Sequence, residues 1–195
     1  MHPTILKRVI GNDGSHLRIC PALLPEYTRH QIHGADYPGI VPYSQSRGMF
    51  DDDLELEARS VRGCLVIGLS SEDIILLDIF EGNEYTREQV LVHPLSSLTS
   101  LDEMLPFEVN GLVPAKAPPV PAPNELEKAL EVNTYVWCRP LSKLRPNLWA
   151  FNEFVRDNAW KWIGSESEGN REYTYAEVDK RQAMNGTIVR SSVME

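Results

Sequence analysis

The sequence predicts an α+β fold, a domain that combines short helices with short strands, on three observations. Its 195 residues suffice for one domain with a sizeable core. Hydrophobic residues make up 42% of the chain and charged residues 24%, the mixture of an ordinary globular protein. Segments with helical spacing also alternate along the chain with short apolar runs that suit strands.

The first part of the chain predicts a helix followed by strands. Ile5, Leu6, Val9 and Ile10 fall on one side of a helix over residues 3–10, and a Gly-Asn-Asp-Gly turn ends it. From residue 17 to 42 the chain changes to short apolar or aromatic runs separated by proline and glycine. This punctuation is typical of strands and turns.

A strand, a helix and a second strand are predicted in the middle of the chain. Residues 62–68 (RGCLVIG) form an apolar run fit for a buried strand. The following Ser-Ser-Glu-Asp supplies an N-cap with acidic residues in the first turn, and apolar residues continue the helix until Gly82 ends it. Residues 85–93 (YTREQVLVH) then alternate as a strand does.

The C-terminal half predicts one more strand and one more helix. Six prolines lie between residues 105 and 123 and predict a loop or excursion within the domain. Residues 131–138 (EVNTYVWC) suit a strand, and apolar residues over 147–163 have helical spacing. We therefore expect a single domain over residues 1–164, with the Pro-rich excursion at about 105–123 and a polar tail over 165–195.

The charge of the chain argues against polyanionic partners. Lys and Arg number 19 and Asp and Glu 28, which gives 19 − 28 = −9. Nucleic acids and anionic membrane surfaces both need clustered positive charge. No run approaches the roughly 18 apolar residues of a membrane span, and the start lacks the apolar core of a signal peptide, so we expect a cytoplasmic protein.

The cysteines and histidines predict no metal site and no His- or Cys-based catalysis. Cys20, Cys64 and Cys138 are far apart and have no metal-ligand spacing, so we expect three reduced, mostly buried thiols. The five histidines share no spacing either.

Three motifs in a fixed order carry a family resemblance. They are YPGIVP at residues 37–42, VRGCLVIGLSSEDIILLDIFEGNEYTREQV at residues 61–90, and a late strand followed by a tryptophan-containing helix. Over roughly residues 1–164 the chain resembles the gamma-glutamylcyclotransferase-like family, which includes plant avirulence-induced-gene proteins and gamma-glutamylamine cyclotransferases. The resemblance implies a small mixed β-barrel flanked by helices, with a cavity that takes a γ-glutamyl group.

The resemblance also implies a reaction and its residues. A γ-glutamyl amide cyclises to 5-oxoproline when its own α-amine attacks its γ-carbonyl, which requires a base but no metal, cofactor or covalent nucleophile. Glu81 matches the family's general base and Tyr85 its cavity tyrosine, while Tyr37, Gly39 and Ile40 are candidate substrate-binding residues. From the residues alone, Glu81 also suits a solvated helix end and Tyr37 a packing aromatic.

One motif of the family has no counterpart in this sequence. Family members begin with a strand that ends in Tyr-Gly-Ser/Thr-Leu, whose loop donates to the developing oxyanion, and here Met1-His2-Pro3 stands where the residues after it would be. Losing one such donor costs about 2–4 kcal/mol of transition-state stabilisation. We expect a chain that is short at its N-terminus, a replacement loop, or a fold that has lost the reaction.

Three functions follow as hypotheses. The first is an enzyme that acts on a small γ-glutamyl substrate. The second is a non-catalytic ligand-binding or interaction protein, and the third is a tailoring enzyme for a glutathione-derived conjugate. A missing strand would also leave unpaired sheet edges, which predicts possible self-association.

Overall fold

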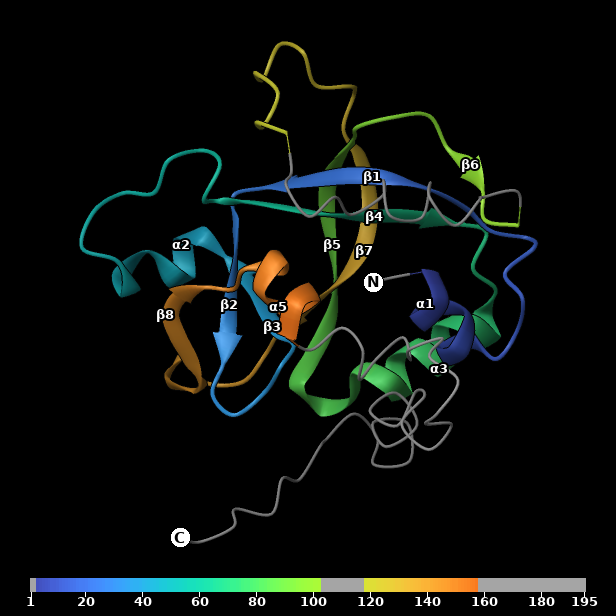
Figure 1. Cartoon of the computed structure of the whole chain (residues 1–195), viewed down its shortest axis with the longest axis horizontal. Helices are drawn as coiled ribbons and strands as arrows, with labels where there is room; N and C mark the ends of the chain where they lie inside the picture. Colours follow the sequence, from blue (N-terminus) through green and yellow to red (C-terminus); the bar gives the residue numbers. More distant parts are fainter. Residues whose placement is uncertain (1–2, 103–117, 158–195) are drawn as a thin grey trace, which may run out of the picture.

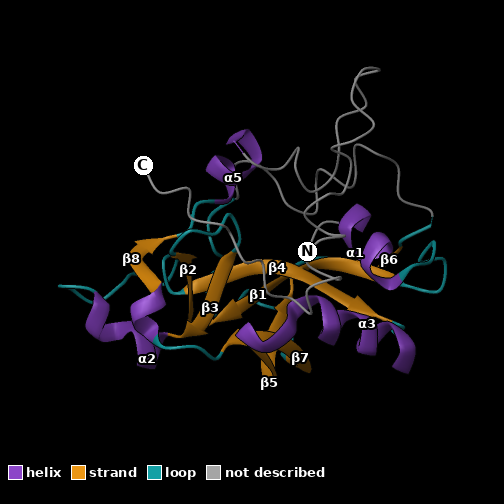
Figure 2. Cartoon of the chain, turned by 90° about the horizontal axis from the view of Figure 1, so that it is seen from below, coloured by secondary structure: helices purple, strands orange, loops and turns teal. Residues whose placement is uncertain are grey.

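A computed structural model describes residues 3–102 and 118–157, and it confirms the predicted α+β fold. The strands curl into a half-barrel, with a few short helices around it (Figure 1). Figure 2 shows the strands as a curved layer, with α1 (Pro3–Ile10) and α3 (Ser71–Glu81) at one end and α2 (Tyr43–Ser46) at the other. The predicted helix over residues 3–10 and the helix that ends before Gly82 are both confirmed.

The larger sheet is organised around its first strand. Its members are β1 (Arg18–Pro25), β4 (Ser60–Ile67), β5 (Tyr85–Pro94), β6 (Thr99–Ser100) and β7 (Leu130–Trp137). The order is β4-β1-β5-β7, and β6 also pairs with β1. β1 pairs antiparallel with β4 along its whole length, and β5 pairs antiparallel with β7. The predicted strands at 62–68, 85–93 and 131–138 are thus confirmed, with bounds that differ by one or two residues.

The smaller sheet continues directly from the larger one. Its strands are β2 (Tyr27–Ile32), β3 (Pro38–Pro42) and β8 (Leu144–Leu148), in the order β3-β2-β8. Glu26, between β1 and β2, has a φ of 60°, and its carbonyl accepts the backbone N–H of Tyr43 at 2.8 Å. This bend turns the chain out of the first sheet, so that the two sheets together form the curved wall.

Three clusters of buried residues hold the elements together. The first joins α1 and α3 to β1 through residues such as Val9, Ile19 and Leu77. The second, called here the inner cluster, lies on the opposite face of β1. Its buried members are Cys20, Ala22, Leu24, Leu65, Val90 and Val92. The third joins the two sheets and contains Ile32, Val41, Trp137 and Leu144. Because β1 contributes to the first two, both of its faces are buried, which explains its almost uninterrupted apolar sequence.

The predicted helix over 147–163 is wrong in its first part. Asn147 and Leu148 belong to β8, where Leu148 pairs with His30 of β2, and the helix α5 begins only at Phe151 and is described to Asp157. The spacing between Leu148 and Phe151 suits a helix, but Leu148 pairs with β2 as a strand residue. Residues 158–163 lie outside the described residues.

The domain bounds stay a prediction. Residues 103–117 of the excursion and the tail over 165–195 lie outside the described residues. Residues 118–123, which are described, contain no regular element, as the prolines predict. They contact the barrel through Arg62, whose Nη2 donates to the carbonyls of Pro118 and Pro119 at 2.7 and 2.9 Å.

The thiols differ from one another in exposure. Cys20 is buried and Cys64 half-buried, but Cys138 is exposed, so the expectation of mostly buried thiols is wrong for Cys138. All three are free cysteines. Among the described helices, none is long and apolar enough to cross a membrane.

Gly39 is required by a close approach between the sheets. A Cβ at this position would lie 3.0 Å from Leu144 Cδ2 and 3.3 Å from Trp137 Cβ, tighter than ordinary van der Waals contact. We expect Gly39→Ala to lower the free energy of unfolding by about 1–3 kcal/mol through overpacking. Gly63→Ala, in β4, is the matched control, because a Cβ there meets nothing within 4 Å. Equal urea midpoints for the two variants would contradict the close approach.

Candidate active site

Glu81 is the last residue of α3 and stands at a fixed junction. Gly82 follows with a φ of 64°, a conformation that favours glycine, and its N–H bonds the carbonyl of Asp78. A single 3-10 turn, Gly82–Glu84, then leads directly into β5 at Tyr85. The glycine therefore ends the helix and sets the direction in which the chain leaves Glu81.

Two tyrosines fasten this junction to the start of β3. The hydroxyl of Tyr37 donates to Glu84 Oε2 at 2.9 Å, and the hydroxyl of Tyr85 donates to the carbonyl of Pro38 at 2.8 Å. Each segment thus contributes one phenol to the other. Because the two bonds cross between residues 37–38 and 84–85, the predicted site residues Tyr37 and Tyr85 lie together beside the end of α3.

A second set of contacts joins the same helix end to the paired strands β5 and β7. Tyr135 and Arg87 are directly opposite each other in this antiparallel pair. Tyr135 donates to Asp78 Oδ1 at 2.7 Å, and Arg87 Nη2 lies 3.5 Å from Asp78 Oδ2. Asp78 is therefore held from both strands, and its role is to position the last turn of α3.

The pKa of Tyr135 responds to both carboxylates at the end of α3, Asp78 and Glu81. Burial raises the pKa of the Tyr135 phenol, the hydrogen bond to Asp78 and the charge of Asp78 raise it further, and the charge of Glu81 adds to the same shift. The phenol consequently stays protonated at neutral pH. It presents a neutral donor to Asp78, within the field of the Glu81 carboxylate.

Gly39 and Ile40 are neighbours in β3 and therefore lie on opposite faces of the strand. Gly39 is buried against Trp137, and Ile40 packs against the inner cluster. Trp137 in turn meets the Tyr85 ring edge-on, with ring centres 5.7 Å apart. Any contact of Gly39 or Ile40 with a substrate would therefore use backbone groups, and their binding role stays a prediction.

The arrangement suits a small, positively charged group. Glu81 is half-buried, and Tyr37 and Tyr85 bond to the segments next to it, while ammonium ions are attracted both to carboxylates and to aromatic faces. Glu84, Tyr135 and Asp78 were not among the predicted site residues. The contact between Tyr135 and Asp78 joins a strand to a helix 57 residues apart, and no local sequence pattern indicates it.

Removing the phenol of Tyr135 tests the second set of contacts. We expect Tyr135→Phe to lower the free energy of unfolding by about 1 kcal/mol, because Asp78 loses a hydrogen-bond donor. Tyr27→Phe, also on a strand, is the control, since the Tyr27 hydroxyl makes no hydrogen bond with a described residue. Chemical unfolding measures both, and a loss as large in Tyr27→Phe would remove the special role of the Tyr135 hydroxyl.

Comparisons with known proteins agree with the motifs. The chain matches the family model described as gamma-glutamyl cyclotransferase, AIG2-like, over residues 2–150. A search of curated proteins finds no match. Among solved structures, the chain is similar to two Arabidopsis thaliana proteins known from solution structures. One has 22% identity and a TM-score of 0.46, over 84% of this chain and 72% of that chain; the other has 25% identity and a TM-score of 0.38, over 74% and 69%. The family match spans most of the chain and includes every element of the site, so the chain belongs to the gamma-glutamyl cyclotransferase, AIG2-like family.

Proposed function

We propose that the protein is a cyclotransferase that releases 5-oxoproline from a small γ-glutamyl amide, with Glu81 as general base. The single observation that carries this proposal is the placement of Glu81. It ends α3 within the family's FEG motif, beside the crossed hydrogen bonds of Tyr37 and Tyr85. The family assignment supports cyclotransferase chemistry on a small molecule.

The proposed reaction needs little from the protein beyond a base and a fixed geometry. The Glu81 carboxylate takes a proton from the α-ammonium of the substrate, and the freed amine attacks the γ-carbonyl to form a five-membered ring. The amide C–N bond then breaks as the leaving nitrogen takes the proton that Glu81 holds. The second proton, lost by the ring nitrogen, also passes to the leaving amine, which departs as an ammonium ion. No water is consumed, and Glu81 returns to its carboxylate form. The attack is intramolecular, so correct folding of the substrate replaces a second reactant.

Tyr37 and Tyr85 are proposed to form the wall against which the γ-glutamyl group binds. Their hydroxyls are engaged with Glu84 and the Pro38 carbonyl, which holds both rings in place. Binding energy is then not lost to ordering these side chains. The peptide groups of Gly39 and Ile40, which follow Pro38 in β3, are the predicted backbone contributors.

A non-catalytic binding role is the second candidate, and one observation favours it. The family's Tyr-Gly-Ser/Thr-Leu motif, which donates to the oxyanion, has no counterpart in the sequence. A protein with the Glu81 junction but without oxyanion donors would bind a γ-glutamyl compound and turn it over slowly or not at all.

Product analysis separates these functions. The protein would be incubated with γ-glutamylalanine and, separately, with γ-glutamylethylamide, and the products would be resolved chromatographically. The proposal predicts 5-oxoproline together with an equal amount of alanine or ethylamine. Release of glutamate instead would indicate hydrolysis and contradict cyclisation, and binding of both compounds without any release would favour the second candidate.

A further inference from the structure

Arg29 is a charged side chain that the proposed mechanism does not use. It lies on the half-buried face of β2, opposite to the face of the fully buried Thr28 and His30. It lies in the middle of β2, directly opposite Ile40 of β3. Ile40 and Tyr27, which share its face of the sheet, both pack against the inner cluster. Arg29 therefore extends from a mainly apolar face, an unusual place for a guanidinium group.

The guanidinium has few partners for so enclosed a position. Its Nη1 donates to the carbonyl of Arg62 at 3.5 Å, a long bond, and its central carbon lies 4.6 Å from the centre of the Trp149 ring. Nε is buried and has no hydrogen-bond partner. Nη2 makes no hydrogen bond with a described residue, and the Arg29 side chain as a whole is half-buried.

No carboxylate of the described residues forms an ion pair with Arg29, although acidic residues outnumber basic ones in the chain. Glu153, in the first turn of the neighbouring helix α5, is exposed and is not paired with it. Burial lowers the pKa of Arg29 to about 10, so the group remains charged at neutral pH. A half-buried guanidinium with no carboxylate partner among the described residues contributes little to folding, which points to a role in binding.

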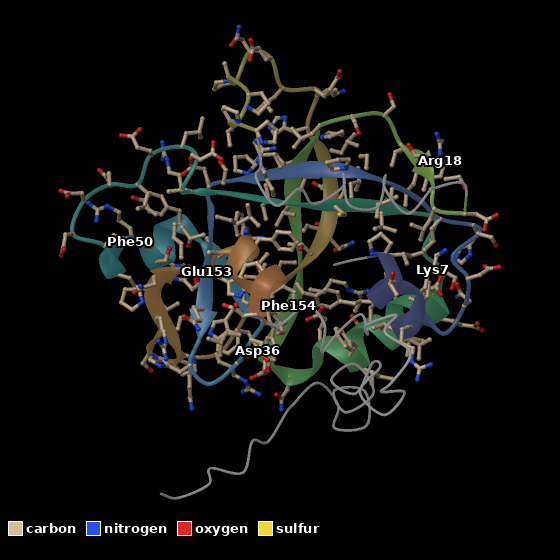
Figure 3. All side chains as sticks on the ribbon, in the orientation of Figure 1. Lys7, Arg18, Asp36, Phe50, Glu153 and Phe154 are labelled. Carbon is tan, nitrogen blue, oxygen red and sulfur yellow. The ribbon has the colours of Figure 1, made fainter. Side chains whose placement is uncertain are left out.

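Arg29 is connected to the candidate active site through Trp149. The indole N–H of Trp149 donates to the carbonyl of Asp36 at 3.0 Å, and Asp36 precedes Tyr37 in the chain. The Trp149 ring also stacks with Phe154 of α5, with ring centres 5.3 Å apart. Figure 3 shows Phe154 and Asp36 in the same part of the molecule, beside β2 and β3. Trp149 therefore contacts both the Arg29 guanidinium and the backbone next to Tyr37, whose hydroxyl bonds Glu84 near Glu81.

We propose that Arg29 and Trp149 form a carboxylate-binding subsite, in which Arg29 Nη2 receives a carboxylate of the substrate and Trp149 holds the guanidinium plane in position. Arginine is the side chain best suited to carboxylates, because its donors form a planar fork. The choice of ligand rests on the proposed function, since a γ-glutamyl compound carries a carboxylate on its glutamyl part. A γ-glutamyl amino acid carries a second one on its leaving group.

Binding measurements on inactive protein test this subsite. In the Glu81→Gln background, calorimetric titration with γ-glutamylalanine should show that Arg29→Met weakens binding by between about tenfold and a hundredfold. Arg29→Lys should retain part of the affinity, because it keeps the charge but not the fork. Arg145→Met is the matched control, since Arg145 is an exposed arginine on β8 of the same sheet, and it should bind as the parent does.

The second ligand identifies which carboxylate is bound. γ-Glutamylethylamide lacks the carboxylate on the leaving group. Weakened binding of both compounds in Arg29→Met assigns the subsite to the γ-glutamyl carboxylate, and weakened binding of γ-glutamylalanine alone assigns it to the leaving amino acid. Unchanged affinity for both compounds, or an equal loss in Arg145→Met, would overturn the inference.

Thermal unfolding separates binding from a structural role. Without ligand, Arg29→Met should melt at the same temperature as the Glu81→Gln parent or higher, because a half-buried charge is removed. With γ-glutamylalanine, the parent and Arg145→Met should gain more stability than Arg29→Met. A large loss of stability without ligand would contradict the subsite.

The subsite and the proposed function can fail separately. If binding depends on Arg29 but the unsubstituted chain releases no 5-oxoproline, the subsite is supported and the proposed function is contradicted. If the chain releases 5-oxoproline but its affinity does not depend on Arg29, the proposed function is supported and the subsite is contradicted.

Discussion

Glu81→Gln is expected to lower the rate of 5-oxoproline release by a factor of about 100 to 10,000, the range that general bases typically contribute. Glutamine has nearly the same shape as glutamate but cannot accept the proton of the α-ammonium. Binding of the substrate should weaken less, because Glu81→Gln removes the attraction to the ammonium group but leaves the crossed hydrogen bonds of Tyr37 and Tyr85 in place. The effect therefore belongs in kcat, measured in steady-state assays with γ-glutamylalanine.

Glu88→Gln is the matched control for this prediction. Glu88 is exposed on β5, three residues beyond Tyr85, and the same chemical change there removes one negative charge from the neighbourhood. It should leave kcat within about twofold of the parent value, since a surface charge has little effect on a shielded site. Activity that persists unchanged in Glu81→Gln would exclude Glu81 as the base.

The largest effect on stability is expected from Asp73→Ala. Asp73 is buried at the start of α3, where its carboxylate accepts hydrogen bonds from the backbone and the hydroxyl of Ser70 at 2.9 Å, and from Asn12 at 2.9 Å. It also lies 3.1 Å from His16. Alanine removes the capping box and leaves several donors without an acceptor, so the free energy of unfolding should fall by about 2–4 kcal/mol.

Glu72→Ala provides the comparison for Asp73→Ala. Glu72 precedes Asp73 in the first turn of α3 but is exposed, and its loss should change stability by about 0.5 kcal/mol through the helix dipole alone. Urea unfolding measures both variants. Equal losses would show that the buried hydrogen bonds of Asp73 contribute little.

The same carboxylate gives stability a defined pH dependence. Burial opposes the ionisation of Asp73, but hydrogen bonds from Ser70, His16 and Asn12 outweigh it and lower its pKa from 3.8 to about 2. Because the folded pKa lies below the unfolded one, the contribution is complete above about pH 4 and is lost as the pH falls toward 2. The difference in stability between the parent and Asp73→Ala should therefore narrow over this interval.

The parts of the fold that the sequence predicts well are those whose signals are local. Ser70 and Asp73 predict the start of helix α3, and Gly82 predicts its end. In the structure, Ser70 and Asp73 form the capping box, and Gly82 is the C-cap. The helix predicted around Leu148 is wrong, because the spacing of Leu148 to later apolar residues is also the spacing of a helix. The register with β2 that makes it a strand depends on residues more than a hundred positions away.

The same distinction applies to the site. Tyr37, Glu81 and Tyr85 stand in recognisable motifs, and the structure brings Tyr37 and Tyr85 together at the end of α3. Tyr135 and Arg29 belong to no motif, and their contacts are with residues distant in sequence: Tyr135 with Asp78, and Arg29 with the carbonyl of Arg62. Such contacts follow from sheet register and from helix packing on the sheet, which local patterns do not specify.

Turnover of glutarylalanine tests the central claim most directly. This compound equals γ-glutamylalanine without the α-amine, so it keeps both carboxylates and the amide but has no nucleophile of its own. The account predicts that the protein releases alanine from γ-glutamylalanine and none from glutarylalanine, which should nevertheless inhibit the reaction competitively. Release of alanine from both compounds at similar rates would show hydrolysis by water and contradict intramolecular aminolysis at Glu81.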